Sequence, residues 1–502
     1  MKAVKLLVGF ILLNIIAIYI ILFTPVNQSV LVPIIEENIT KSSKVTDVKV
    51  NKFELSLSGL NIVILLDNQE VKVNSSFDIF SQDLDLTYNV NFTDISIFNK
   101  ISGQKLQGTF STQGTLKGKF NNLDLKGKAL IASGDINYSL NINDDINNIN
   151  AIIKNMKIDK LLYTVSQPAY AKADLNIDLK IKSLNNLNGN IITTLSNGML
   201  NNNIIKKDFN ITLPSKPTFK LDALTTLDKN IISTKTNIKT FVANIDTKAT
   251  IFDTKTSTLN SDYIVTIPNL SKLYFVTNQK MKGDIKINGD VVFKDTLTAT
   301  FNSNKFNGKI AGKLEKDDLK VSIKDINSLK ILDMIYYPMV FNSTVDLNLD
   351  YNIKSKKGKS NLTMKDGKFL PNQLSDTIKK FIQKDLTTEI YKTTVIKTDI
   401  NNQKLNSTLF MESKNSKITS DKIFIDLEKS KIDSDIDLTY FKYAVGIKLT
   451  EQLTNPKVKI DTNKLVKSKA KEKVKEALDK KLGDKLDDDT KKAIGGFLDK
   501  LF

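Results

Sequence analysis

Apolar and polar residues alternate in many segments of this chain, and this period of two constrains the fold more than any other feature of the sequence. Because successive side chains of a β-strand point to opposite faces, the alternation predicts a sheet with one apolar and one polar face. Strands of a buried parallel sheet would instead read as continuous apolar runs. We therefore predict a mainly β fold, with a long and mostly antiparallel sheet over residues 45–462. The clearest apolar sets are Leu84, Leu86, Tyr88, Val90; Ile136, Tyr138, Leu140; Leu175, Ile177, Leu179, Ile181; and Val345, Leu347, Leu349, Tyr351.

Glycines that follow a polar residue interrupt this alternation at short intervals. They occur at Lys117–Gly118, Lys126–Gly127, Asn307–Gly308 and Asp366–Gly367. Dipeptides of this kind between alternating segments predict the turns of β-hairpins. With about 12 residues for each strand and its turn, residues 45–460 are expected to hold roughly 35 strands.

Three stretches depart from the alternation and predict helices. Residues 25–44 are expected to form a short helical connector. Residues 373–392 carry an amphipathic stripe, with Ser375 or Asp376 as the N-cap, and such an inserted helix would lie across the apolar face of the sheet as a plug or lid. Residues 463–502 predict C-terminal amphipathic helices on a Lys-rich background.

The C-terminal helices have two interpretations. Basic amphipathic helices can lie on anionic membranes, and Lys467, Lys471 and Lys475 would then be the membrane-surface contacts. Alternatively, the segment forms a helix that caps the end of the sheet.

The N-terminal residues 1–24 predict a signal-anchor transmembrane helix. Leu6 to Phe23 form an uncharged stretch of 18 residues, which is long enough to cross a bilayer core of roughly 30 Å. Lys2 and Lys5 precede this stretch, and the next Lys is Lys41. This asymmetry predicts a cytoplasmic N-terminus, with the rest of the chain beyond the membrane. A cleaved signal peptide is the alternative, but the stretch ends without a small-x-small cleavage site.

The composition excludes several kinds of chemistry. The chain has no Cys and no His, so thiol nucleophiles, Ser-His-Asp triads and the usual zinc sites are excluded. No Walker-type loop and no Rossmann fingerprint is present. Paired carboxylates occur at Asp144–Asp145, Asp317–Asp318 and Asp487–Asp489, but each pair lies in a polar segment typical of a turn or a helix start, where solvated surface charge is the ordinary explanation. We therefore predict no enzymatic activity, no catalytic residues, no metal and no cofactor. The net charge of +18 comes from Lys spread along the chain without Arg, which argues against a nucleic-acid partner.

The order of an anchor, a short helix, Gly-punctuated alternating strands and a terminal amphipathic segment resembles the AsmA-like family, which includes proteins of the TamB and YhdP type. The most specific pieces are IPNLSKLYFVTNQKMKGDIKINGDV at residues 267–291 and LTEQLTNPKVKIDTNKL at residues 449–465. The resemblance implies a twisted sheet curled into an open groove, lined by the apolar sets named above.

The resemblance also implies a location and a function. The chain would be a single-pass protein of the inner membrane of a Gram-negative bacterium, with most of its residues in the periplasm. It would carry phospholipid acyl chains between the inner and outer membranes, in support of outer-membrane lipid homeostasis. Its partners would be phospholipids, the inner membrane and, at the C-terminal end, the outer membrane or a protein within it.

Two non-enzymatic alternatives remain open on the residues alone. A periplasmic scaffold or assembly factor for outer-membrane proteins would show the same alternation, and so would a membrane-anchored β-sandwich adhesin. Either would differ from the groove in having a packed, closed core.

Overall fold

The computed structural model describes residues 26–43, 45, 47–441 and 443–461, together with isolated positions between 463 and 480. The predicted anchor at 1–24, most of the tail at 463–502 and the three candidate membrane contacts Lys467, Lys471 and Lys475 lie outside the described residues. The chain divides into two compact units, Met1–Asp262 and Tyr263–Phe502, and the boundary lies within strand β14 (Thr258–Ile267).

Unit 1 is an antiparallel sheet in which each strand from β1 to β13 pairs with the next. The strands alternate in direction, as the period of two predicted. Their bounds are β1 Val48–Leu55, β2 Gly59–Leu66, β3 Gln69–Asp78, β4 Asp83–Phe92, β5 Phe110–Lys119, β6 Asn122–Ile131, β7 Gly134–Ile142, β8 Ile146–Lys157, β9 Ala171–Ser183, β10 Asn188–Leu200, β11 Thr218–Asp228, β12 Ile231–Thr240 and β13 Asn244–Asp253.

Unit 2 repeats this arrangement, with consecutive antiparallel pairing from β15 to β26. Its strands are β15 Ile285–Phe293, β16 Leu297–Ser303, β17 Lys309–Glu315, β18 Asp318–Asn327, β19 Phe341–Asn352, β20 Lys357–Phe369, β21 Tyr391–Asn401, β22 Lys404–Glu412, β23 Ser416–Asp426, β24 Lys431–Tyr440, β25 Tyr443–Gln452 and β26 Asn455–Asp461.

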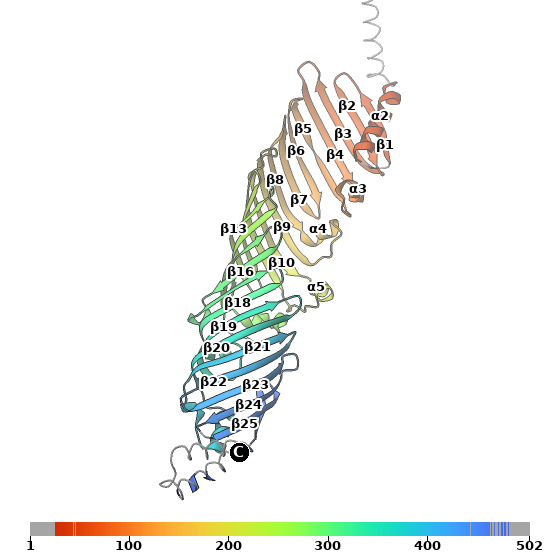
Figure 1. The fold of residues 1–502 in the computed structure, drawn as a ribbon. Helices are drawn as coiled ribbons and strands as arrows, with labels where there is room; N and C mark the ends of the chain where they lie inside the picture. Colours follow the sequence, from red (N-terminus) through yellow and green to blue (C-terminus); the bar gives the residue numbers. More distant parts are fainter. Residues whose placement is uncertain are drawn as a thin grey trace, which may run out of the picture. The chain divides into compact units, whose positions relative to one another are not determined.

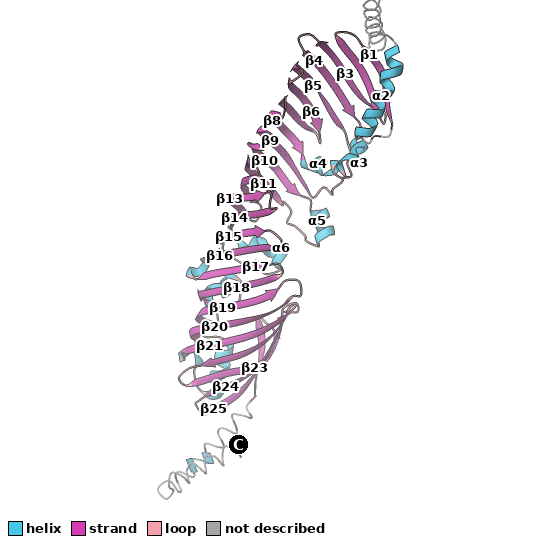
Figure 2. Ribbon diagram, turned by 45° about the horizontal axis from the view of Figure 1, so that its top comes forward, coloured by secondary structure: helices cyan, strands magenta, loops and turns pink. Residues whose placement is uncertain are grey.

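The helical connections of unit 1 all follow even-numbered strands. The 3-10 helix η1 and helix α3 follow β4, α4 follows β8, and α5 follows β10. Because neighbouring antiparallel strands run in opposite directions, all of these connections lie at the same end of the strands, where Figure 2 shows α3, α4 and α5. In the described part of unit 1, the connections at the opposite end are all short hairpin turns. The bounds are η1 Ile95–Phe98, α3 Asn99–Ser102, α4 Ile158–Thr164 and α5 Asn202–Phe209.

Unit 2 follows the same rule. The 3-10 helix η3 follows β16, α7 follows β18, and α8 with the 3-10 helix η4 follows β20. The segment between β14 and β15 holds two further short helices. The bounds are η2 Leu270–Leu273, α6 Tyr274–Thr277, η3 Lys305–Asn307, α7 Ser328–Met334, α8 Gln373–Ile382 and η4 Leu386–Thr388.

The predicted connector is present as helix α2 (Val26–Ser43), which lies against the first strand (Figure 1). Gln28 Nε2 donates to the carbonyl of Phe53 at 3.0 Å, and Val50 N donates to the Glu36 carboxylate at 2.7 Å. An uncovered edge strand exposes unpaired backbone groups that invite pairing with other chains. Helix α2 therefore protects the outer edge of unit 1.

Several glycines that were predicted to mark turns lie inside strands instead. Gly118 is in β5, Gly127 is in β6, and Asp366–Gly367 lies within β20, where Asp366 has a φ of 49°. The predicted turns at these positions are wrong. The strands are therefore longer than expected, and the described residues form 26 strands where the sequence suggested roughly 35.

The inserted helix is shorter than the predicted range of 373–392. Helix α8 ends at Ile382, because Gln383 adopts a left-handed φ of 54°, and β21 already begins at Tyr391. The N-cap is neither Ser375 nor Asp376. Asn372 Oδ1 accepts a hydrogen bond from Ser375 N at 3.1 Å, while Ser375 Oγ accepts one from Asn372 N at 3.0 Å. This reciprocal pair places Asn372 in the capping position.

Candidate functional site: an apolar sheet face

The predicted apolar residues of unit 1 form registered rows on one face of the sheet. One row consists of leucines on four successive strands: Leu86 of β4 lies opposite Leu116 of β5, which lies opposite Leu125 of β6, which lies opposite Leu140 of β7. A parallel row contains Val90, Thr112, Ala129 and Ile136. The alternation therefore assigned the faces of these strands correctly.

This apolar face is only half-buried. On β4, Leu84, Leu86, Tyr88 and Val90 are half-buried, whereas Asp85, Thr87 and Asn89 between them are exposed. The predicted residues of β7 and β9 are half-buried too, apart from Leu175, which is 8% exposed. Neighbouring side chains shield one another partly, but a closed core would bury such residues almost completely. The face of unit 1 thus keeps apolar area open to solvent.

Tyr88 and Tyr138 are hydrogen-bonded to each other across this face, over Gly114 and Gly127, which lie between them in the same row. Tyr88, Gly114, Gly127 and Tyr138 stand in register on β4 to β7, and the hydroxyls of Tyr88 and Tyr138 are 2.5 Å apart. A Cβ atom at Gly114 would lie 2.3 Å from the Tyr88 hydroxyl, and one at Gly127 would lie 2.5 Å from the Tyr138 hydroxyl. The absence of side chains at the two glycines is what lets the rings lean inward and meet.

A threonine extends this polar bridge. Thr112 Oγ1 is 2.6 Å from the Tyr138 hydroxyl and donates to the carbonyl of Lys128 at 3.0 Å. Burial and the hydrogen bond with Tyr138 raise the pKa of Tyr88, so this hydroxyl stays protonated near neutral pH. Sequence reasoning placed both tyrosines on the apolar face but missed Thr112 and the two glycines, because only the strand register brings them together.

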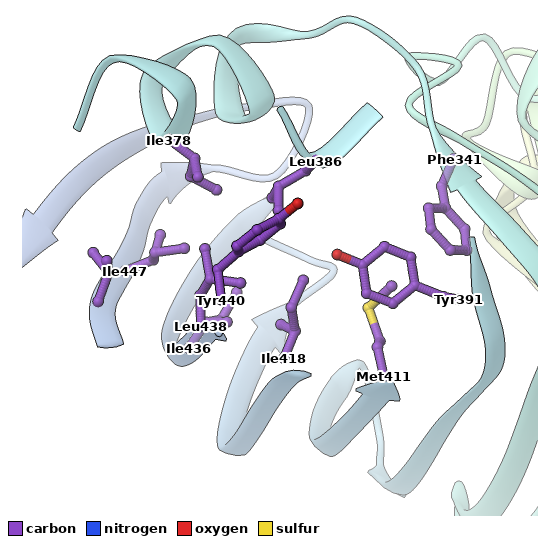
Figure 3. Packing of buried hydrophobic residues seen from close by; sticks show 11 residues of the cluster. Phe341, Ile378, Leu386, Tyr391, Met411, Ile418, Ile436, Leu438, Tyr440 and Ile447 are labelled. Carbon is purple, nitrogen blue, oxygen red and sulfur yellow. The ribbon is translucent and has the colours of Figure 1, made fainter. Parts of the chain in front are cut away.

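Unit 2 differs, because part of its apolar face is covered by the inserted helix. Figure 3 shows Ile378 of α8 and Leu386 of η4 pointing toward strand side chains that include Leu438 and Ile447. Ile378 is 2% exposed and Leu386 1% exposed. The predicted plug is therefore present in this unit. The packed cluster consists of Phe341, Ile378, Leu386, Tyr391, Met411, Ile418, Ile436, Leu438, Tyr440, Val445 and Ile447.

The β19 residues predicted to line the groove lie beside this cluster. Val345 is 5% exposed, and Leu347, Leu349 and Tyr351 are half-buried. Leu347 lies opposite Ile323 on β18 and Leu362 on β20. The alternation assigned the face of β19 correctly as well.

Polar contacts hold the end of the plug in place. Asp385 accepts hydrogen bonds from Thr387 N at 3.0 Å and Thr387 Oγ1 at 2.6 Å, and its carboxylate is 2.8 Å from Lys379 Nζ. The bond with Lys379, followed by those with Thr387, lowers the pKa of Asp385 to about 2. Asp385 is therefore ionised at neutral pH and ties η4 to α8.

A buried carboxylate borders the cluster on the strand side. Glu389, 5% exposed, accepts hydrogen bonds from Ser413 Oγ at 2.7 Å, Asn415 Nδ2 at 2.9 Å and the Tyr440 hydroxyl at 2.8 Å. Burial alone would raise the pKa of Glu389, but these bonds outweigh it and lower the pKa below its ordinary value. Burial and the bond to Glu389 raise the pKa of Tyr440 to about 12.

We expect Glu389 to make the stability of unit 2 depend on pH. Since its folded-state pKa is lowered, its contribution is complete above the ordinary value of 4.5 and is lost as the pH falls through the folded-state pKa. Glu389→Gln should cost about 1–3 kcal/mol at neutral pH, because a charged acceptor is lost. Urea unfolding from pH 7 to pH 3 should show the difference between wild type and variant shrinking at low pH. A difference that is constant with pH would contradict this assignment.

The described residues contain no group of three or more acidic, His or Cys side chains placed to hold a metal ion. Among the helices that the structure describes, none combines the length and hydropathy needed to cross a membrane. No protein-family model, curated protein or solved structure matches this chain.

Proposed function

We propose that the chain binds phospholipid acyl chains on the half-buried apolar face of unit 1 and transfers them between membranes. The observation that carries the proposal is the incomplete burial of registered apolar rows, such as Leu86, Leu116, Leu125 and Leu140. Each CH₂ group removed from water contributes about 0.8 kcal/mol, so an acyl chain laid along these rows gains several kcal/mol. Movement along such a face requires no bond to be made or broken, so the function needs no catalytic residue.

The proposal includes a location. The uncharged stretch Leu6 to Phe23, with Lys2 and Lys5 before it, anchors the chain in the inner membrane with its N-terminus in the cytoplasm. The two units then lie in the periplasm, where they take phospholipid toward the outer membrane or a protein within it. This arrangement follows the resemblance to the AsmA-like family.

A scaffold remains the second candidate, and the packing of unit 2 favours it for that part of the chain. There, Ile378 and Leu386 fill the space over the strands and make a closed core. A scaffold needs such a rigid core and no open apolar face. We therefore assign acyl-chain binding to unit 1 and not to the plugged region of unit 2.

The test is Leu86→Asp in the full-length protein, purified in mild detergent and analysed by mass spectrometry. Because Leu86 is half-buried, the new carboxylate can reach water, and folded protein is expected at the normal level. Co-purifying phospholipid should fall severalfold, since an ionised group now lies where acyl chains bind. Thr87→Asp, on the exposed opposite face, introduces the same charge and should leave the lipid content unchanged.

Two outcomes would overturn the proposal. If Leu86→Asp folds normally and retains its phospholipid, acyl chains do not use this face. If Leu86→Asp unfolds unit 1, as measured by loss of hydrogen-exchange protection in β3–β6, the face belongs to a closed core and the scaffold is favoured.

A further inference from the structure

The polar face of unit 1 contains a hollow of about 910 Å³ over strands β3 to β8. Two adjacent cross-strand rows line it. One runs from Lys72 on β3 through Gln113 and Lys128 to Asn137 on β7. The other runs parallel to the first and contains Thr115 and Lys126. Their side chains are on the face opposite to the leucine rows.

The lining of this hollow contains no carboxylate. Apart from tyrosine, glycine and one isoleucine, it consists of lysine, amide and hydroxyl side chains. The cross-strand rows that flank the hollow do contain acidic residues. Glu70 and Asp135 lie in the row on one side, and Asp85 and Asp124 lie in the row on the other side. Elsewhere on the polar face, Lys and Asp form cross-strand ion pairs, such as Lys117 with Asp85 at 2.7 Å. Lysines are thus the only charged residues in this lining, although Asp135 lies in the adjoining depression that shares Lys128.

Two lysines carry most of this charge. Lys72 is neutralised by Glu70 at 2.8 Å, but neither Lys126 nor Lys128 forms an ion pair with any described acid. Both are exposed and point to the same side of β6, separated by about 7 Å along the strand. Two like charges at this distance repel each other, and an anion between them removes that repulsion.

We propose that this hollow binds a soluble phosphorylated sugar. Its phosphate lies between Lys126 and Lys128, where two ammonium groups act as point-charge partners for the oxyanion. The sugar hydroxyls exchange hydrogen bonds with the amides of Asn89, Gln113 and Asn137, which serve both as donors and as acceptors. The hollow is open to solvent and larger than a phosphate ion, so a hydroxylated body has room beside the phosphate. This site lies on the face opposite to the acyl-chain site and does not depend on it.

Calorimetric titration of the full-length protein in detergent tests the proposal, with glucose 6-phosphate, glucose and inorganic phosphate as probes. Glucose 6-phosphate should bind at least tenfold more tightly than either of the other two. The double variant Lys126→Glu/Lys128→Glu should weaken its binding at least tenfold. Lys180→Glu/Lys182→Glu, which alters two exposed lysines at the same spacing on β9, makes the same change in net charge and should bind as wild type does.

The remaining outcomes overturn the proposal. Equal binding of inorganic phosphate and glucose 6-phosphate would show that the sugar is not recognised. An equal loss in the β9 control would show that binding follows net charge alone. If the double glutamate variant loses exchange protection in β5–β7, Lys126→Gln/Lys128→Gln replaces it, and tight binding by that folded variant refutes the site.

Discussion

Leu438→Asp is expected to unfold unit 2. Leu438 is 1% exposed at the centre of the packed cluster, where it lies opposite Ile418 on β23 and Val445 on β25. All three residues of this row are apolar and buried, so the new carboxylate would have no partner. An unpaired buried charge costs several kcal/mol, which is a large fraction of the stability of a domain.

Hydrogen exchange resolved by mass spectrometry measures the outcome in each unit separately. Peptides from β22–β25 should lose their protection, whereas peptides from β3–β6 should retain it. Thr439→Asp is the matched control, because Thr439 is the next residue of β24 and is exposed on the opposite face. Its effect should stay within about 0.5 kcal/mol. Equal effects of the two substitutions would mean that this strand has no buried face.

The second large effect is expected at Gly114→Val, under the tyrosine bridge. An ideal Cβ atom at Gly114 would lie 2.2 Å from the Lys126 carbonyl and 2.3 Å from the Tyr88 hydroxyl. The backbone of β6 cannot yield as a flexible side chain can, so strands β5 and β6 must shift. Overpacking of this kind costs about 1–3 kcal/mol, and the hydrogen bond between Tyr88 and Tyr138 would be broken as well.

Urea unfolding compares this variant with two others. Tyr88→Phe removes the hydrogen bond without adding volume, so it should cost only about 1 kcal/mol. Thr115→Val introduces the same residue at the next position, on the polar face, and should be nearly neutral. A Gly114→Val variant as stable as Thr115→Val would show that β5 and β6 have more room than the structure gives them.

The alternation of residues was sufficient to predict a mainly β, antiparallel fold and the faces of the named strands. Leu86 and Tyr88 lie on the half-buried face and Asp85 and Thr87 on the exposed one, because the period of two is a local property of extended backbone. It was not sufficient to predict the strand count, because Gly118 and Gly127 have the sequence pattern of turns but lie inside β5 and β6. Gly127 actually makes room for an aromatic ring from the next strand. That role depends on the strand register, which residues close in sequence do not determine.

The candidate sites, too, could be predicted only in part from the sequence. The apolar face was predictable residue by residue, whereas the bridge between Tyr88 and Tyr138 depends on four strands in register. The plug was predicted as an amphipathic helix across the apolar face. Its length was overestimated because nothing local marks Gln383 as left-handed, and its cap was misplaced because Asn372 acts together with Ser375. The lysine-lined hollow could not be predicted, because its lining residues come together only when rows from six strands are aligned.

The pairing of each strand with its immediate successor within a unit has a consequence for how the chain acquires its structure. A newly available strand needs only its predecessor as a template, and no pairing within β1–β13 or within β15–β26 must wait for a distant segment. Contacts that are local in sequence favour rapid folding, and structures whose parts touch only their neighbours can grow from a single starting point. The sheet of each unit can therefore form strand by strand during synthesis of the chain. Helix α2 can cover the edge of β1 before the later strands have been added.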